Sequence, residues 1–212
     1  MANYLEPGRI ELLSRGWLLI GKPHGSRDAA TRDLAAVLDD ALPTTVTGNI
    51  TGAHWTKLIV NLNNALGAVT GYDSSQVLSD NYLPQVGTAL MREGLHVVQR
   101  ADANLSDIPD VSARQLQLLG WLPLPVATWL ATRKARGYGI QGRLLGSTLQ
   151  SLERHKPTEI DYLNGEIVRL GLEVGVPTPL NSLAVQLVHE VERSGMFFDP
   201  QVVAAEFHRT GL

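Results

Sequence analysis

The sequence contains no cysteine, which removes disulfide bonds, thiolate nucleophiles and cysteine-ligated metals from consideration. Positive charge is not in excess either, because 18 lysine and arginine residues stand against 21 aspartate and glutamate residues, for a formal net charge of -3. A chain with this balance lacks the basic field that draws a protein to nucleic acid. We therefore expect no nucleic-acid partner.

Long hydrophobic runs are also missing. The N-terminal residues show no basic stretch followed by an apolar one, so they do not resemble a secretory signal peptide. The longest apolar run, residues 118–131, contains Pro123 and Pro125 and falls short of the roughly 20 residues that a transmembrane helix needs. We expect a cytoplasmic protein with no membrane segment.

What remains is the composition of a globular chain, since 44% of the 212 residues are hydrophobic. Residues 1–50 differ from the rest. Two short apolar runs there, "RIELL" and "GWLLIGK", flank residues 14–16 and predict a strand, a turn and a second strand. Residues 26–42 predict a helix with Ser26 as its N-cap, and the β-prone run "TTVTG" follows. Together these patterns predict a small β-β-α-β unit.

From residue 51 to residue 212 the pattern predicts an almost entirely helical domain. Thr158 with Asp161 three residues later forms a capping-box pattern, and Thr178 before a proline is a second helix start. The Leu- and Trp-rich residues 111–133 predict one or two buried helices broken by prolines. The remaining helices are predicted at 53–71, 81–103, 158–175, 178–195 and 199–211.

Three glycines in "RGYGIQGRLLG" have the G-x-G-x-x-G spacing of a dinucleotide-binding loop: Gly137, Gly139 and Gly142. Such a loop needs a buried strand before its first glycine and an acidic residue at the end of a second strand. The preceding letters are "ATRKAR", which is no buried strand, and Glu159 stands at a predicted helix start. We interpret this segment as a basic loop between helices.

A candidate site lies in "WTKLIVNLNNALG". On a helix of about 3.6 residues per turn, Lys57, Asn61 and Asn64 share one face, whereas Asn63 points elsewhere. Asparagine is a poor helix former, so two of them on one stripe carry a local energetic cost. The face is either an ordinary solvated surface or a site where an ammonium donates a proton and carboxamides orient a polar substrate.

A second candidate segment, "GSTLQSLERHKPTEIDYLNG", contains Ser147 and Glu159. Ser147 could serve as an N-cap, and Glu159 could interact with a helix dipole at a first helical position. The six histidines show no H-E-x-x-H or other metal-binding spacing, so we expect no metal site.

Taken together, these segments resemble the C-terminal half of ketopantoate reductases (2-dehydropantoate 2-reductases). "Y-L-E-P-G-R-I" and "W-L-L-I-G" near the start are similar to the last strands of that family's nucleotide domain. The resemblance covers nearly the whole chain and implies a helical domain of the 6-phosphogluconate dehydrogenase-like type behind a remnant of a Rossmann domain. The matching motifs are "W-x-K-L-x-x-N-x-x-N-A-L" at 55–66, "S-x-L-Q-x-L" at 147–152, "T-E-I-D-Y-L-N-G-E-I-V" at 158–168 and "G-V-P-T-P-L-N" at 175–181.

The resemblance implies an NADPH-dependent reduction of ketopantoate to pantoate, a step of pantothenate and coenzyme A biosynthesis. NADP is then the expected cofactor and a small 2-oxo acid the expected substrate. Lys57 matches the lysine that protonates the forming alkoxide, where a positioned ammonium meets developing negative charge. Asn61, Asn64 and Ser147 match residues that contact the substrate. Glu159 matches the glutamate that helps to position substrate and the cofactor ribose.

The sequence departs from the family pattern in two respects. Ser151 stands where the family has an aspartate, and the chain begins after the family's glycine-rich nucleotide loop. We therefore expect the catalytic and substrate half of a reductase, dependent on a separate N-terminal nucleotide-binding domain. Two alternatives stay open: a half acting on another 2-oxo acid, or a non-catalytic helical module. A homo-oligomer is expected, because exposed apolar surface favours association.

Overall fold

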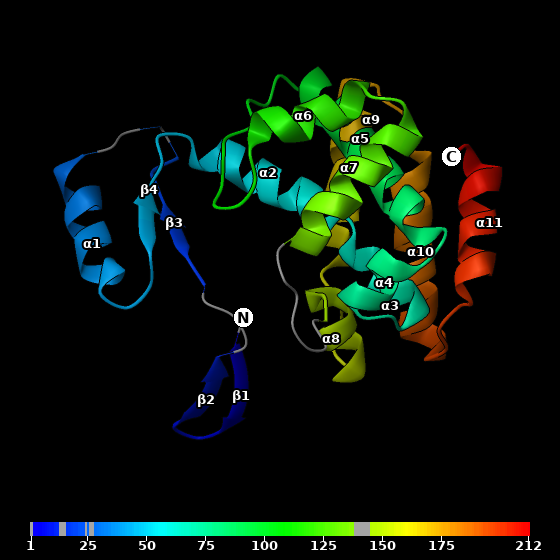
Figure 1. The fold of residues 1–212 in the computed structure, drawn as a ribbon, viewed down its shortest axis with the longest axis horizontal. Helices are drawn as coiled ribbons and strands as arrows, with labels where there is room; N and C mark the ends of the chain where they lie inside the picture. Colours follow the sequence, from blue (N-terminus) through cyan, green and yellow to red (C-terminus); the bar gives the residue numbers. More distant parts are fainter. Residues whose placement is uncertain (1, 13–15, 24, 26–27, 138–144) are drawn as a thin grey trace. The chain divides into compact units, whose positions relative to one another are not determined.

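The computed structural model is mainly helical, as the sequence predicts, with four short strands near the start of the described chain (Figure 1). It divides into two compact units, Met1–Thr56 with Leu105–Ala113, and Lys57–Asn104 with Arg114–Leu212. The described residues are 2–12, 16–23, 25, 28–137 and 145–212. Within these ranges, no helix is long and apolar enough to cross a membrane.

The first unit contains two separate strand pairs. β1 (Ala2–Glu6) pairs antiparallel with β2 (Arg9–Leu12), and β3 (Leu18–Ile20) pairs parallel with β4 (Thr44–Val46). Strands thus lie on both sides of residues 14–16 as predicted, although each pairs with a different partner, and residues 14 and 15 of the predicted turn lie outside the described residues. Between β1 and β2 the chain reverses at Gly8, whose φ of 81° is a left-handed conformation that glycine reaches without strain.

Helix α1 (Ala29–Asp39) connects β3 to β4 and packs against β4. Its N-cap is Asp28, whose carboxylate accepts hydrogen bonds from the backbone N–H of Thr31 at 2.9 Å and from its hydroxyl at 2.7 Å. The predicted N-cap, Ser26, lies outside the described residues. This segment is thus a β-α-β unit whose helix begins with a carboxylate cap, the arrangement that satisfies free N–H groups at a helix start.

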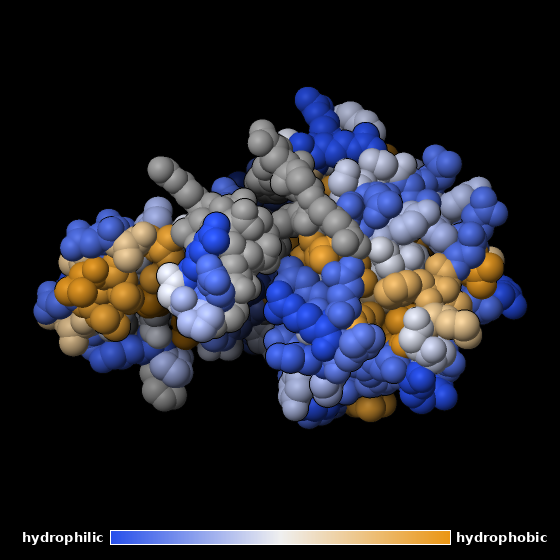
Figure 2. Space-filling view, turned by 90° about the horizontal axis from the view of Figure 1, so that it is seen from below, coloured by the Kyte–Doolittle hydropathy of each residue, from blue (hydrophilic) through white to orange (hydrophobic). Residues whose placement is uncertain are grey.

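Helix α1 leaves an apolar surface uncovered within the first unit. Leu34 is 52% exposed and Val37 is 70% exposed, whereas Ala35 between them is buried. Figure 2 shows hydrophobic surface over the region of α1. Within the described residues, the face of α1 that carries Ala35 is packed, whereas the face that carries Leu34 and Val37 is exposed.

The second unit is built around three long helices that pack on one another: α5 (Leu83–Arg100), α9 (Asn164–Val174) and α10 (Pro179–Ser194). α11 (Pro200–Thr210) lies alongside α10 (Figure 1). Pro179 occupies the first turn of α10 and Gly195 ends it in a left-handed conformation, as predicted. The largest fully buried side chains are Phe207, Ile59, Leu62, Leu66, Leu83, Leu90, Leu95, Leu149, Ile160 and Ile167.

The predicted continuous helix over residues 53–71 is interrupted. α2 (Ile50–Asn61) ends before α3 (Asn64–Thr70) begins. The side-chain N–H of Asn63 donates to the Val60 carbonyl at 3.2 Å, the acceptor that the Asn64 N–H would use in an unbroken helix. Gly71 ends α3 with a φ of 73°, as predicted.

The residues predicted as one or two buried helices form α6 (Ala113–Trp121) and α7 (Leu124–Gly137), but much of their apolar surface is exposed. Trp121 is 78% exposed and Trp129 is 58% exposed, so burial was wrongly predicted. Helix α7 runs directly into Gly137, which confirms that no strand leads into the G-x-G-x-x-G pattern. Its other two glycines lie outside the described residues.

Two helix starts differ from the sequence patterns. A short 3-10 helix, η1 (Ile160–Tyr162), precedes α9, and the Thr158 hydroxyl accepts from the Ile160 N–H at 3.3 Å instead of forming a capping box with Asp161. Thr178 makes no side-chain cap bond at the start of α10. Two shorter helices complete the unit, α4 (Ser74–Ser79), which was not predicted, and α8 (Ser147–Glu153).

Candidate active site

The candidate residues all belong to the second unit, and the structure brings two of them into contact. α3 packs against α8, which places the side-chain N–H of Asn64 3.4 Å from the hydroxyl oxygen of Ser147. This is a long hydrogen bond, and the residues it joins are 83 positions apart in the sequence. The contact places a carboxamide and a hydroxyl next to each other.

Gly146 explains how the start of α8 comes so close to α3. A Cβ at this position would lie 3.1 Å from the Oδ1 atom of Asn64, a tighter approach than side chains normally make. Gly146 is also the N-cap of α8, so the predicted capping role of Ser147 is wrong. Because Ser147 is the first helical residue and is exposed, its hydroxyl is directed to Asn64 rather than to the helix backbone.

Lys57 and Asn61 stand one turn apart on the last part of α2, so they share one face of the helix. Lys57 is exposed and Asn61 is half-buried. Neither side chain has a hydrogen bond or ion pair within the described residues. The break after α2 limits the predicted common face to Lys57 and Asn61, because Asn64 belongs to the next helix.

Glu159 is exposed and immediately precedes η1, where it is the N-cap rather than the first residue of a long helix. In the described part of the chain, no hydrogen bond joins it to the other four candidates. Residues on both sides of Glu159 bond to side chains of α10. The Thr158 N–H donates to Glu192 at 2.8 Å, and Asp161, two residues after Glu159, contacts His189 at 3.0 Å.

His189 connects these two bonds. Its Nδ1 lies 2.6 Å from Glu192 and its Nε2 lies 3.0 Å from Asp161. The hydrogen bond to Glu192 raises the pKa of His189, partial burial opposes this, and the contact with Asp161 adds to the rise. Burial acts to raise the pKa of Glu192, but the hydrogen bonds from His189 and Thr158 outweigh it, so that the pKa is lowered. Through these two contacts His189 ties α10 to the segment that carries Glu159.

Sequence reasoning missed this histidine. His189 and Glu192 are three residues apart on a predicted helix, a spacing that could have indicated a pair. Nothing in the sequence indicates Asp161 as the second partner, because it lies 28 positions away.

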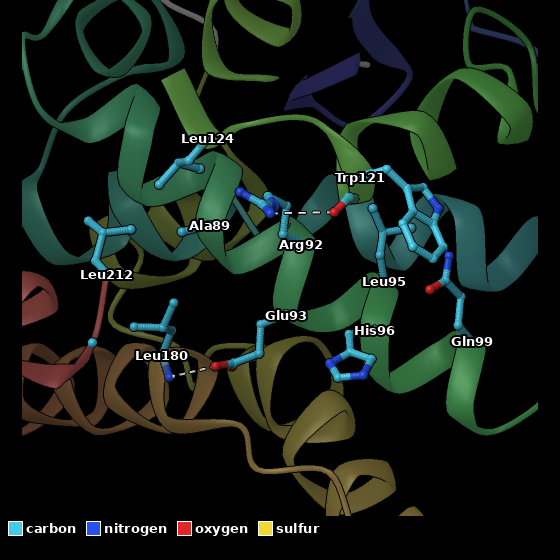
Figure 3. Close-up of a pocket in the computed structure, with 12 residues that line it drawn as sticks. Ala89, Arg92, Glu93, Leu95, His96, Gln99, Trp121, Leu124, Leu180 and Leu212 are labelled. Carbon is cyan, nitrogen blue, oxygen red and sulfur yellow. Dashed lines mark hydrogen bonds between the residues drawn. The ribbon is translucent and has the colours of Figure 1, made fainter. Parts of the chain in front are cut away.

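An open hollow of about 530 Å³ lies elsewhere in the second unit, beside α5 and the connection between α6 and α7. Figure 3 shows Arg92, His96 and Trp121 among the side chains around it, and Arg92 donates to the Gly120 carbonyl at 3.4 Å. None of the five candidate residues lines this hollow. The candidate residues are half-buried or exposed, and they lie apart from this hollow.

The β3–α1–β4 segment offers a test for a dinucleotide site, because a Rossmann unit binds pyrophosphate with free N–H groups at a helix start. Here the carboxylate of Asp28 already accepts from the first turn of α1 and forms an ion pair with Lys22. Gly21 makes room for the backbone that directly follows β4, since a Cβ there would lie 2.8 Å from the Thr47 carbonyl oxygen. The described residues of this segment therefore do not fit a dinucleotide phosphate.

The second unit is a helical domain of the kind found in solved ketopantoate reductases. A PanE/ApbA family ketopantoate reductase structure from Ralstonia eutropha JMP134 superposes with a TM-score of 0.70 at 29% identity, covering 91% of this chain and 57% of that one. The family model of the ketopantoate reductase PanE/ApbA C terminal matches residues 49–192. The chain belongs to this family.

Curated relatives agree with this assignment. The 2-dehydropantoate 2-reductase of Pyrococcus horikoshii is 30% identical over 192 residues, which cover 90% of this chain and 57% of that protein. The enzyme of the same name from Archaeoglobus fulgidus is 26% identical, with 90% and 58% covered. D-mandelate dehydrogenase in complex with NADH shares the fold, with a TM-score of 0.72 at 23% identity and 92% and 60% covered. The chain thus spans a little over half the length of these relatives.

Proposed function

We propose that this chain is the substrate-binding and catalytic half of a ketopantoate reductase-like enzyme. The proposed reaction is the NADP-dependent reduction of 2-dehydropantoate to pantoate in the cytoplasm. The observation that supports it most is the contact between Asn64 and Ser147, next along the chain to the Lys57–Asn61 face, in a chain of this family. Residues 51–212 would form the catalytic domain, and residues 1–50 the end of a nucleotide-binding domain.

Each candidate side chain has a role in this proposal. The Lys57 ammonium would protonate the oxygen of the 2-oxo group as negative charge develops there. Asn61, Asn64 and Ser147 would bind the carbonyl and carboxylate oxygens through N–H and O–H donors. Glu159 would orient a hydroxyl of the substrate. The exposed ammonium of Lys57 and the half-buried amide of Asn61, both without a described partner, support this role.

A complete reductase on this proposal needs a nucleotide-binding domain that the described residues do not provide. The Asp28 carboxylate at the start of α1 disfavours a phosphate there, because like charges repel. We therefore propose that NADP is held by a separate domain that associates with this chain.

The exposed tryptophans of α6 and α7 favour a second function, a helical module that associates with another copy of the chain. Trp121, Trp129 and Leu118 are each more than half exposed, and clustered exposed apolar side chains mark interaction surfaces. This module would require none of the catalytic roles above.

The decisive experiment measures NADPH fluorescence and oxidation with the purified chain and 2-dehydropantoate, with and without an added family nucleotide-binding domain. Oxidation that depends on the added domain supports the proposal. In that mixture Lys57→Ala should lower the rate by about 100-fold or more. Lys134→Ala is the matched control, because Lys134 lies on α7 and bonds to Gln115. No oxidation of NADPH in either mixture would favour the non-catalytic alternative, and faster oxidation with another 2-oxo acid would change the proposed substrate.

A further inference from the structure

A buried series of hydrogen bonds crosses the second unit, beginning at Glu93 on α5. Its carboxylate accepts from the backbone N–H of Leu180 at 3.0 Å and from that of Asn181 at 2.8 Å, as Figure 3 shows for Leu180. Glu93 therefore caps the start of α10, the task that Thr178 was predicted to perform. A carboxylate is favoured at this position because the helix N-terminus carries partial positive charge.

Asn181 continues the series into the core. Its side-chain N–H₂ group donates to Glu93 at 2.8 Å and to the Leu90 carbonyl at 3.3 Å, and its oxygen accepts from Asn164 at 2.9 Å. Both asparagines have 0% exposed surface. A buried amide must be hydrogen-bonded to be tolerated, so these contacts fix the rotamers of both side chains.

The series ends at the break between α2 and α3. The side-chain N–H₂ of Asn164 donates to the Leu62 carbonyl at 3.3 Å. That carbonyl needs a donor because the Leu66 N–H, its partner in a continuous helix, bonds to Asn63 at 3.1 Å instead. Asn164 thus satisfies a backbone group that the break leaves free.

The oxygen of Asn164 is buried and has no hydrogen-bond partner among the described residues. A buried acceptor without a partner is destabilising, so the side-chain oxygen of Asn164 lowers the stability of the fold. Its two donor bonds, to Leu62 and Asn181, are what offset this cost. The side chain therefore acts through its N–H₂ group.

We infer that Asn164 is a positioning residue of the proposed 2-oxo acid site. By holding the Leu62 carbonyl, it maintains the break that separates Asn64 from the Lys57–Asn61 face and leaves Asn64 beside Ser147. This inference rests on the proposed function for its ligand, but the bond to the break stands on geometry alone. In an unbroken helix, Asn64 would point along the α2 face instead.

The first test is amide hydrogen exchange of the full chain, comparing wild type with Asn164→Leu, which is close in size but donates no hydrogen bond. Exchange of the backbone amides of residues 62–66 should become roughly tenfold faster. Loss of the buried bond from Asn164 to the Leu62 carbonyl makes local opening of this segment easier. Val203→Ala on α11 is the control, since it removes a buried methyl pair without touching the series. Equal exchange at residues 62–66 in wild type and Asn164→Leu would overturn the inference.

A second pair of variants guards against misfolding of Asn164→Leu. Asn181→Asp keeps the oxygen that accepts from Asn164 but places a second carboxylate beside that of Glu93. The two negative charges repel, so the series of hydrogen bonds should weaken. Adding Glu93→Gln supplies an N–H₂ donor to the new carboxylate and should restore slow exchange at residues 62–66. Failure of the double variant to recover, with a folded chain, would contradict a continuous series.

The ligand arm uses 2-dehydropantoate titrated into the same chains, observed through the side-chain amide signals of Asn61 and Asn64. Asn164→Leu should weaken binding about tenfold or more, whereas Val203→Ala should not. Faster exchange at the break with unchanged affinity would show that the break does not position the site, which overturns the inference. If wild type binds no 2-dehydropantoate, the proposed function fails, and the exchange comparison alone decides whether Asn164 holds the break.

Discussion

The Oδ1 atom of Asn63 lies where a side chain on Gly87 would stand, only 2.2 Å from the position of an added Cβ. Gly87 lies in the second turn of α5, where alanine would normally be the better helix former by about 1 kcal/mol. We expect Gly87→Ala to lower the free energy of unfolding by about 1–3 kcal/mol, because either Asn63 or the helix must shift. Chemical denaturation measures this difference.

Two further variants separate the contact from helix propensity. Gly120→Ala on α6 is the control, since its Cβ would meet only Leu95, at 3.9 Å, and it should leave stability unchanged or raise it. Adding Asn63→Ala to Gly87→Ala should recover part of the loss, because the clashing atom is gone. A loss that persists unchanged in the double variant would place the strain elsewhere.

Substitution of Glu159 tests ligand contact with little effect on the stability of the fold. The side chain is exposed and has no described partner, so Glu159→Gln should change the free energy of unfolding by no more than about 0.5 kcal/mol. If Glu159 contacts the 2-oxo acid, the same variant should weaken binding of 2-dehydropantoate, measured by titration calorimetry. Glu153→Gln, also exposed, is the comparison within the neighbouring helix. Equal affinity in wild type and Glu159→Gln would leave only a role at the helix start.

The network formed by His189, Glu192 and Asp161 predicts a defined pH dependence of stability. Because the pKa of His189 is raised above its ordinary 6.5, its contribution to stability is complete below that value and is lost as pH rises through the folded-state pKa. Because the pKa of Glu192 is lowered from 4.5, its contribution is present above 4.5 and is lost as pH falls through the folded-state pKa. The network should stabilise most between these two ordinary values.

Thermal denaturation at a series of pH values checks this. Wild type should lose stability above pH 6.5 relative to His189→Gln, which cannot carry the charge. Direct titration of the His189 ring by NMR should give a pKa above 6.5. A pKa at or below that value would contradict the contacts with Glu192 and Asp161.

Exposed tryptophan predicts self-association of the chain. Trp129 on α7 is 58% exposed, and the Arg133 guanidinium lies 5.4 Å from its ring centre. We expect Trp129→Ser to weaken any dimer of the chain by about tenfold or more, measured by analytical ultracentrifugation, because aromatic side chains dominate association energies. Leu172→Ser on α9, a position 79% exposed, should have less effect. Equal weakening by both would indicate non-specific association.

Helix-forming patterns and helix ends were largely predictable, because they depend on neighbours along the chain. Gly71 and Gly195 end helices as predicted, and Pro84 and Pro179 lie in first turns. The errors occur where a distant group supplies the hydrogen bond. The Thr158 pattern failed because its N–H is taken by Glu192.

The candidate site shows the same division. Lys57 and Asn61 share a face as helical spacing requires, but the relation of Asn64 to that face depends on the break and on its contact with Ser147. Exposure of the tryptophans on α6 and α7 was also unpredictable, since composition does not state which face of a helix finds a partner.

The sequence by itself determined the helical class of this protein, the family to which it belongs and the residue types available for chemistry. Local periodicity and motif spacing are enough for that, because they need no knowledge of distant contacts. Only the tertiary structure decided that Asn164 and Asn181, two letters of separate motifs, meet in the core and reach the break beside Asn61. The reason is physical: a buried amide is stable only with partners, and those partners come from helices far apart along the chain.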